Sequence, residues 1–135
     1  MNSPDRLYIE KNTRKIIKRI EDENLLNIKD ATQKEIFLWA MSLGFNAPLK
    51  LENRDGLFLD KNLNTSDMAL FYTCYSANHS DVNDFADKSK IYSYAEECAN
   101  RGFRIINEYF ESGSIETLDR RLLLELNDLY DKLNI

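Results

Sequence analysis

The sequence contains few residues that interrupt secondary structure, with 4 Gly and 2 Pro among 135 residues. Folds built from β-strands alone use many such residues in their turns, so their scarcity argues against an all-β fold. The sequence also lacks an apolar run near the roughly 20 residues that a membrane-spanning helix requires. Hydrophobic residues make up 43% of the chain, which is too many for a disordered protein. The composition therefore predicts an all-α fold, with residues 1–135 forming a single compact domain.

Residues that carry chemistry are scarce as well. His79 is the only histidine, and a lone histidine in a polar stretch is typical of a solvated surface residue. The two cysteines, Cys74 and Cys98, fall in apolar helical patterns that predict buried, unreactive thiols. Zinc-ligand spacings and glycine-rich phosphate loops are absent. The sequence therefore predicts no catalytic residue, no metal and no cofactor.

Positive charge is in the minority, with 18 Lys/Arg against 23 Asp/Glu and a net charge of −5. Up to Lys61 there are 11 Lys/Arg and 10 Asp/Glu, and from Asn62 onward there are 7 and 13. Proteins that bind nucleic acid usually present a basic surface, which the chain as a whole does not offer. Residues 1–5 lack the basic and apolar regions of a secretion signal, and two cysteines without such a signal are typical of a cytoplasmic protein.

About five helices are predicted around one core, together with a short extended run at 6–10. The helices are expected at 14–23, 32–44, 67–75, 89–113 and from 114 onward. Thr32 and Glu35 have the spacing of a capping box, and Gly44 is expected to end that helix in a left-handed conformation. Thr65 or Ser66 and then Ser89 are the expected caps of the next two helices. Residues 46–64 form the insertion, either an irregular loop or a small hairpin around Asp55-Gly56.

The helix at 32–44 is apolar on almost every side and contains the only tryptophan, Trp39. Such a helix is usually central to its domain. We therefore predict that Trp39 lies in the core and that the other helices stack around this one. The alternative is an exposed apolar face meant for a partner.

Five cations gather within nine residues at the start of the first helix: Lys11, Arg14, Lys15, Lys18 and Arg19. The apolar residues Ile16, Ile17 and Ile20 lie on the opposite helical side. A cationic face of this kind can align with a phosphate backbone or with an acidic partner. The alternative is an ordinary solvated face whose cations pair with the acidic residues 21–23.

The last predicted helix carries a narrow leucine stripe at three- and four-residue steps: Leu118, Leu122, Leu126, Leu129 and Leu133. A stripe of this kind can dock on the domain or pair with a second copy of itself. It is the candidate surface for self-association.

The order of a strand at 6–10, a helix at 12–23 and a helix at 32–44 resembles a ribbon-helix-helix unit. In that fold two copies pair their strands into a ribbon that enters the major groove. The outward residues would be Arg6, Tyr8 and Glu10, of which the glutamate is a poor neighbour for phosphates.

A second resemblance rests on one helix and the segments around it. The pattern phenylalanine-x-x-alanine-x-x-leucine-glycine-phenylalanine is present as Phe37, Ala40, Leu43, Gly44 and Phe45. A basic helix precedes it and Ala47-Pro48-Leu49 follows it. Over residues 6–60 the chain thus resembles the small Dnd system-associated proteins, which are encoded beside bacterial DNA phosphorothioation genes.

This resemblance implies a non-enzymatic accessory or regulatory protein of a bacterial DNA-modification or antiviral defence system. Its partner would be DNA or a larger subunit of the complex, and the larger subunits would insert the sulfur. The alternative is an acidic adaptor or inhibitor of phage or plasmid type, which mimics DNA through the charge after Asn62 and does not contact nucleic acid. An enzyme would need a cleft that joins His79 with a cysteine or with two carboxylates.

Overall fold

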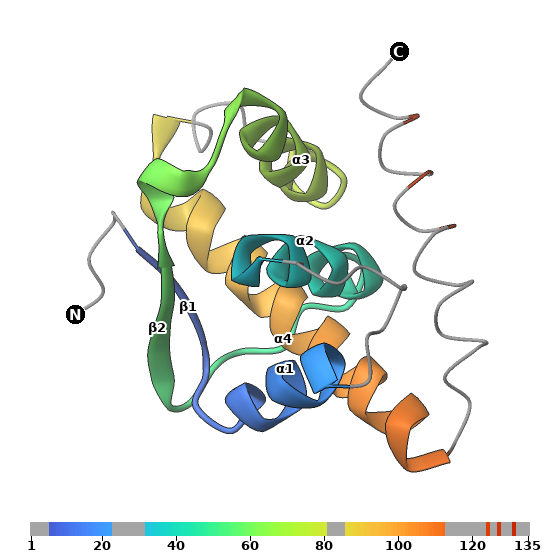
Figure 1. Cartoon of the computed structure of the whole chain (residues 1–135). Helices are drawn as coiled ribbons and strands as arrows, with labels where there is room; N and C mark the ends of the chain where they lie inside the picture. Colours follow the sequence, from blue (N-terminus) through green and yellow to red (C-terminus); the bar gives the residue numbers. More distant parts are fainter. Residues whose placement is uncertain are drawn as a thin grey trace.

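The structure is a computed structural model that describes residues 6–22, 32–80 and 86–112, together with Leu124, Asn127 and Asp131. Its elements follow the order β1 (Arg6–Glu10), α1 (Thr13–Asp22), α2 (Gln33–Gly44), β2 (Arg54–Leu59), the 3-10 turn η2 (Asp60–Asn62), α3 (Thr65–Ser76) and α4 (Lys88–Ser112). Figure 1 shows α2 across the middle of the long α4, with α3 and α1 at opposite ends and the two strands along one side. The described part is mostly helical, as predicted. The all-α prediction is nevertheless corrected, because β1 and β2 form a two-stranded antiparallel sheet.

The sheet joins two segments that lie far apart in the sequence. Tyr8 pairs with Gly56 and Glu10 with Arg54, with one irregularity in the register between Leu7 and Tyr8. The hairpin considered within 46–64 is therefore not formed, because β2 pairs with β1 instead of with a neighbouring strand. The interpretation as a two-copy ribbon is corrected too. β1 is paired within its own chain, and Glu10 is buried with its carboxylate accepting hydrogen bonds from two backbone amides.

Helices α2 and α4 approach each other at two glycines, where their backbones nearly touch. A Cβ added at Gly102 would lie 2.7 Å from Ala40 Cα and closer still to the Ala40 carbonyl group. A Cβ at Gly44 would lie 2.6 Å from the Gly102 nitrogen. Gly44 is the last residue of α2, and the next residue, Phe45, has φ −64° and ψ −19°, which is right-handed. The predicted left-handed helix end is therefore wrong, and Gly44 is required for the close approach to α4.

The caps of the helices follow the predicted chemistry but not always the predicted residues. The capping box of Thr32 and Glu35 is confirmed. Helix α3 is capped by Asn64, which exchanges hydrogen bonds with Asp67, and not by Thr65 or Ser66. At the start of α4, the Asp87 carboxylate accepts from the amides of residues 89 and 90, so Ser89 is not the cap.

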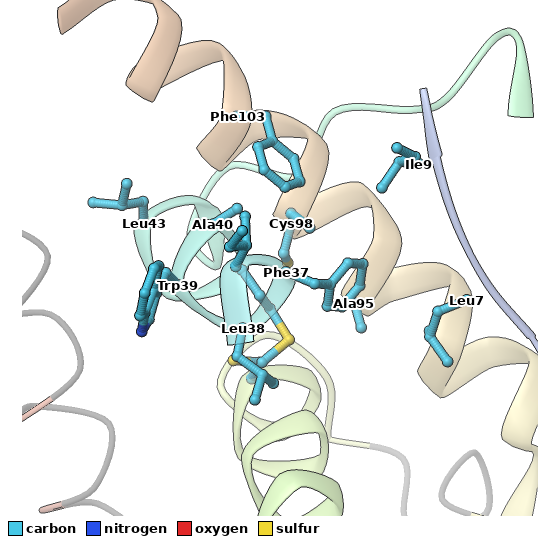
Figure 2. Packing of buried hydrophobic residues seen from close by; sticks show 14 of the residues in the cluster. Leu7, Ile9, Phe37, Leu38, Trp39, Ala40, Leu43, Ala95, Cys98 and Phe103 are labelled. Carbon is cyan, nitrogen blue, oxygen red and sulfur yellow. The ribbon is translucent and has the colours of Figure 1, made fainter. Parts of the chain in front are cut away.

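Within the described residues, the core brings together side chains from α1, α2, α3, α4, β1 and β2. Phe37 of α2 is fully buried and meets the rings of Phe58 and Phe71 at centroid distances of 5.4 and 6.0 Å. Trp39 is 7% exposed, so the prediction that it belongs to the core is confirmed. Figure 2 shows Trp39 and Leu43 on the side of α2 that faces away from α4.

Candidate functional site

Helix α1 divides cleanly into an apolar side and a charged side. Thr13, Ile17 and Ile20 are buried, which fixes the helix against β1 and α4. All five predicted cations are exposed: Lys11, Arg14, Lys15, Lys18 and Arg19. Because α1 begins at Thr13, Lys11 lies in the turn before the helix and not on the helix itself. The structure thus brings the five cations to one end of the molecule but gives them different surroundings.

Arg14 is tied to the start of β2. Its guanidinium group donates to the Asp55 carboxylate, with which it forms an ion pair, and to the Gly56 carbonyl oxygen. The Arg14 hydrogen bond lowers the pKa of Asp55 below its ordinary value. Arg14 therefore fastens α1 to the sheet, and its charge is partly neutralised before any partner arrives.

Arg19 is engaged on the other flank of α1. Its guanidinium carbon lies 4.5 Å from the ring centroid of Phe110, near the end of α4. This is the geometry of a cation–π contact, in which the charge faces the negative side of the ring. Arg19 thus covers an aromatic side chain and connects α1 to α4.

The remaining three cations, Lys11, Lys15 and Lys18, form what we call the lysine row. No ion pair joins any of them to an acidic side chain within the part of the chain that the structure describes. The alternative considered from the sequence was pairing of the cations with residues 21–23. Lys15 and Lys18 form no such pair with Glu21 or Asp22, and Glu23 lies outside the described residues. Glu21 and Asp22 lie at the opposite end of α1 from Lys11, so the helix is cationic at its start and anionic at its end.

The roles of the two arginines could not be found from the sequence. Asp55 is 41 residues from Arg14, and Phe110 lies on a different helix from Arg19. The sequence showed only the clustering of the five cations, because this depends on neighbouring residues alone.

His79 is packed among aromatic rings and is not the solvated surface residue that was expected. Its ring stacks on Tyr75 at 4.0 Å and meets the edge of Tyr94 at 4.7 Å. Its Nδ1 atom lies 2.9 Å from the Tyr75 carbonyl oxygen. These contacts give His79 a packing role between α3 and α4.

Cys74 and Cys98 are both buried as free thiols, as predicted. Burial raises the pKa of the Cys98 thiol above its ordinary value, so the thiolate form is disfavoured. The thiol donates weakly to the Phe45 carbonyl oxygen at 3.7 Å. Because the thiolate is the nucleophile, such a thiol is unreactive.

A pocket of about 330 Å³ lies between the first turns of α2 and α3 and includes Trp39 in its wall. Its charged groups are engaged with one another. Lys34 forms an ion pair with Asp67 at 2.9 Å, and Glu35 and Asp67 are the acidic members of the two capping boxes. These polar groups stabilise helix ends and are not left for a ligand.

Glu96 is a buried carboxylate that the sequence did not single out. It is 3% exposed and accepts hydrogen bonds from the Tyr8 amide at 2.9 Å and from Arg54 Nη1 at 2.6 Å. It thereby connects α4 to both strands. Burial raises the pKa of Glu96 to about 7, although its two donors oppose the shift. The sequence signal was its position directly after Ala95, on the margin of the apolar stripe of α4.

We expect this carboxylate to make the stability of the fold depend on pH. The unfolded chain releases the Glu96 proton near pH 4.5 and the folded chain near pH 7. The contribution to stability is therefore fully present below pH 4.5 and is lost as the pH rises to 7, a loss on the order of 2–3 kcal/mol. Urea unfolding of the wild type and of Glu96→Gln between pH 4.5 and 7 gives the unfolding free energy of each protein against pH. The difference between the two curves measures the contribution of Glu96. If the unfolding free energies of the two proteins changed with pH in the same way, Glu96 would not be the source of the pH dependence.

The remaining observations concern the leucine stripe, metal sites, membrane spans and similarity to known proteins. The leucine stripe of Leu118, Leu122, Leu126, Leu129 and Leu133 lies outside the described residues. Among the residues that are described, no three His, Cys, Asp or Glu side chains are grouped as a metal site. No helix within the same residues is both long and apolar enough to cross a membrane. Comparison of the chain with protein-family models, curated proteins and solved structures gave no match.

Proposed function

We propose that the protein acts by binding and not by catalysis, as an accessory or regulatory component of a bacterial DNA-modification or defence system. The lysine row is the contact surface, and its partner is DNA or an anionic surface of a larger subunit. The observation that carries the proposal is that Lys11, Lys15 and Lys18 are exposed and have no ion-pair partner within the described ranges. Unpaired cations fixed on one surface attract polyanions.

The rigidity of α1 supports this proposal. Ile17 and Ile20 hold one side of the helix in the core, and Arg14 and Arg19 fasten its two flanks. A cationic surface that is already ordered loses less entropy when a partner binds. The inhibitor alternative instead depends on the acidic surplus after Asn62, and it predicts no retention of the protein by any polyanion.

The test is charge reversal on the helix. We expect Lys15→Glu combined with Lys18→Glu to elute from heparin resin at clearly lower salt than the wild type and to lose about tenfold or more in polyanion affinity. Both side chains are exposed, so circular dichroism should show an unchanged fold.

The matched control is Lys50→Glu combined with Lys61→Glu. These lysines are exposed as well, lie outside α1 and give the same change of net charge. The control should elute close to the wild type. Equal losses in both double variants would mean that total charge, not the lysine row, governs binding, and an unaffected α1 variant would refute the proposal.

A further inference from the structure

We propose that the ligand of the lysine row is the phosphodiester backbone of duplex DNA, contacted without reading the bases. This inference rests on the proposed function and narrows it to one class of partner. It follows from the lysines on the outward side of α1, and from the scarcity there of base-reading, exposed aromatic and exposed apolar side chains.

The outward side of α1 lacks side chains that read bases. Paired hydrogen bonds to base edges come mainly from Asn and Gln at adenine and from Arg at guanine, where Lys can also donate. The α1 segment TRKIIKRIED has neither Asn nor Gln, and its two arginines are engaged with Asp55 and Phe110. The exposed Asn12 lies in the turn before α1, next to Lys11, and not on the helix. Lysine ammonium groups contact phosphates as point charges, which positions a protein without selecting a sequence.

Single-stranded nucleic acid fits this surface poorly. Proteins that bind single strands stack successive bases on exposed aromatic side chains. The aromatic ring beside α1, Phe110, is 4% exposed and lies under Arg19. Within the described ranges, the exposed aromatic side chain is Tyr72 on α3. Figure 1 shows α3 at the opposite end of the molecule from α1.

An acidic protein surface fits less well than a phosphate backbone. Stable protein interfaces have an apolar core inside a polar rim. On α1 the apolar residues Ile17 and Ile20 are buried, and Ile16 is half-buried against the core. The outward positions between residues 14 and 22 are all charged, so the surface offers charge without an apolar centre.

The polarity of α1 also indicates how the backbone would lie. Lys11 is next to the start of the helix, where the partial positive charge of the helix dipole adds to that of the lysines. Glu21 and Asp22 at the end of the helix repel phosphates, as does Asp55 to the extent that Arg14 leaves its charge exposed. Contact is therefore confined to the first turns of α1, which corresponds to about three phosphates.

Fluorescence anisotropy tests this with four probes: an AT-rich duplex, a GC-rich duplex of equal length, a single strand and polyglutamate. Three phosphate contacts predict a slope of about −2.7 for log affinity against log salt, or about a 40-fold loss between about 50 and about 200 mM salt. The two duplexes should bind within about twofold of each other and several-fold tighter than the single strand. Lys15→Gln with Lys18→Gln should reduce the slope to about −1, whereas Lys50→Gln with Lys61→Gln should leave it unchanged.

Each other outcome overturns the inference in a recognisable way. Tighter binding to the single strand, to one duplex, or to polyglutamate through the same lysines would refute the duplex backbone and leave the proposed function standing. Absence of binding to every polyanion would refute both.

Discussion

Replacing Gly102 with alanine is expected to destabilise the fold by about 3 kcal/mol or more. In an ordinary helix the same change stabilises by roughly 1 kcal/mol, because glycine is the poorer helix former. Here the added Cβ would occupy the place of the Ala40 backbone, with its nearest neighbours the carbonyl oxygen, the carbonyl carbon and Cα of that residue. Backbone atoms cannot rotate away as a side chain can, so α2 and α4 must separate and lose packing along their length.

Chemical unfolding followed by circular dichroism measures this loss, and Trp39 provides a second signal as the only tryptophan. Gly56→Ala is the matched control, because it adds the same atom at another glycine. There the nearest atoms, at 2.7 and 2.8 Å, belong to the flexible end of the Arg6 side chain, which can move. We expect a change within about 0.5 kcal/mol for the control. Comparable effects at the two glycines would contradict the close contact of α2 and α4.

The glycine contact also indicates where sequence reasoning succeeded and where it stopped. Patterns that depend on neighbouring residues were interpreted correctly: the capping box of Thr32 and Glu35, and the apolar stripe of α4. Gly44 was identified as special but for the wrong reason. A glycine at the end of a helical pattern usually marks a left-handed turn, and the sequence contains nothing to show that another helix backbone lies against it.

The sheet escaped prediction for a similar reason. Residues 6–10 have the composition of a strand, and residues 49–59 carry leucines at 49 and 51 before Asp55-Gly56 and at 57 and 59 after it. A turn signal within 54–59 favours pairing with a close neighbour, because short loops cost less entropy. The actual partner is more than forty residues away, and Glu96 helps to hold the pair by bonding to Tyr8 and Arg54 at once. A contact of three distant segments has no signature in a single sequence.

The sequence located the cationic surface of α1 but did not show that its five cations have different contacts. Five cations within nine residues were equivalent by spacing. The structure separates them into two arginines that hold the helix in place and three lysines that face solvent. The lysines are therefore the residues to mutate in a binding experiment, because changes at Arg14 or Arg19 would alter packing as well as charge.

Replacing Trp39 with alanine is expected to cost about 3–5 kcal/mol of unfolding free energy. The side chain is 7% exposed and belongs to the core cluster, although it lies on the side of α2 that faces away from α4. Removing a large buried aromatic loses its transfer free energy and leaves a cavity. Urea unfolding followed by circular dichroism measures the change, since the variant has no tryptophan fluorescence.

Tyr72→Ala is the control for Trp39→Ala, because it removes an aromatic side chain that is 36% exposed on α3. We expect it to cost under about 1 kcal/mol. If Trp39→Ala cost no more than this control, the indole would contribute little to the core. The outward side of α2 would then be the better candidate for an apolar partner, and the cationic surface of α1 would lose its place as the main contact. A large cost would place the indole in the core, where α2 supports the fold, and would leave the lysine row of α1 as the proposed contact surface.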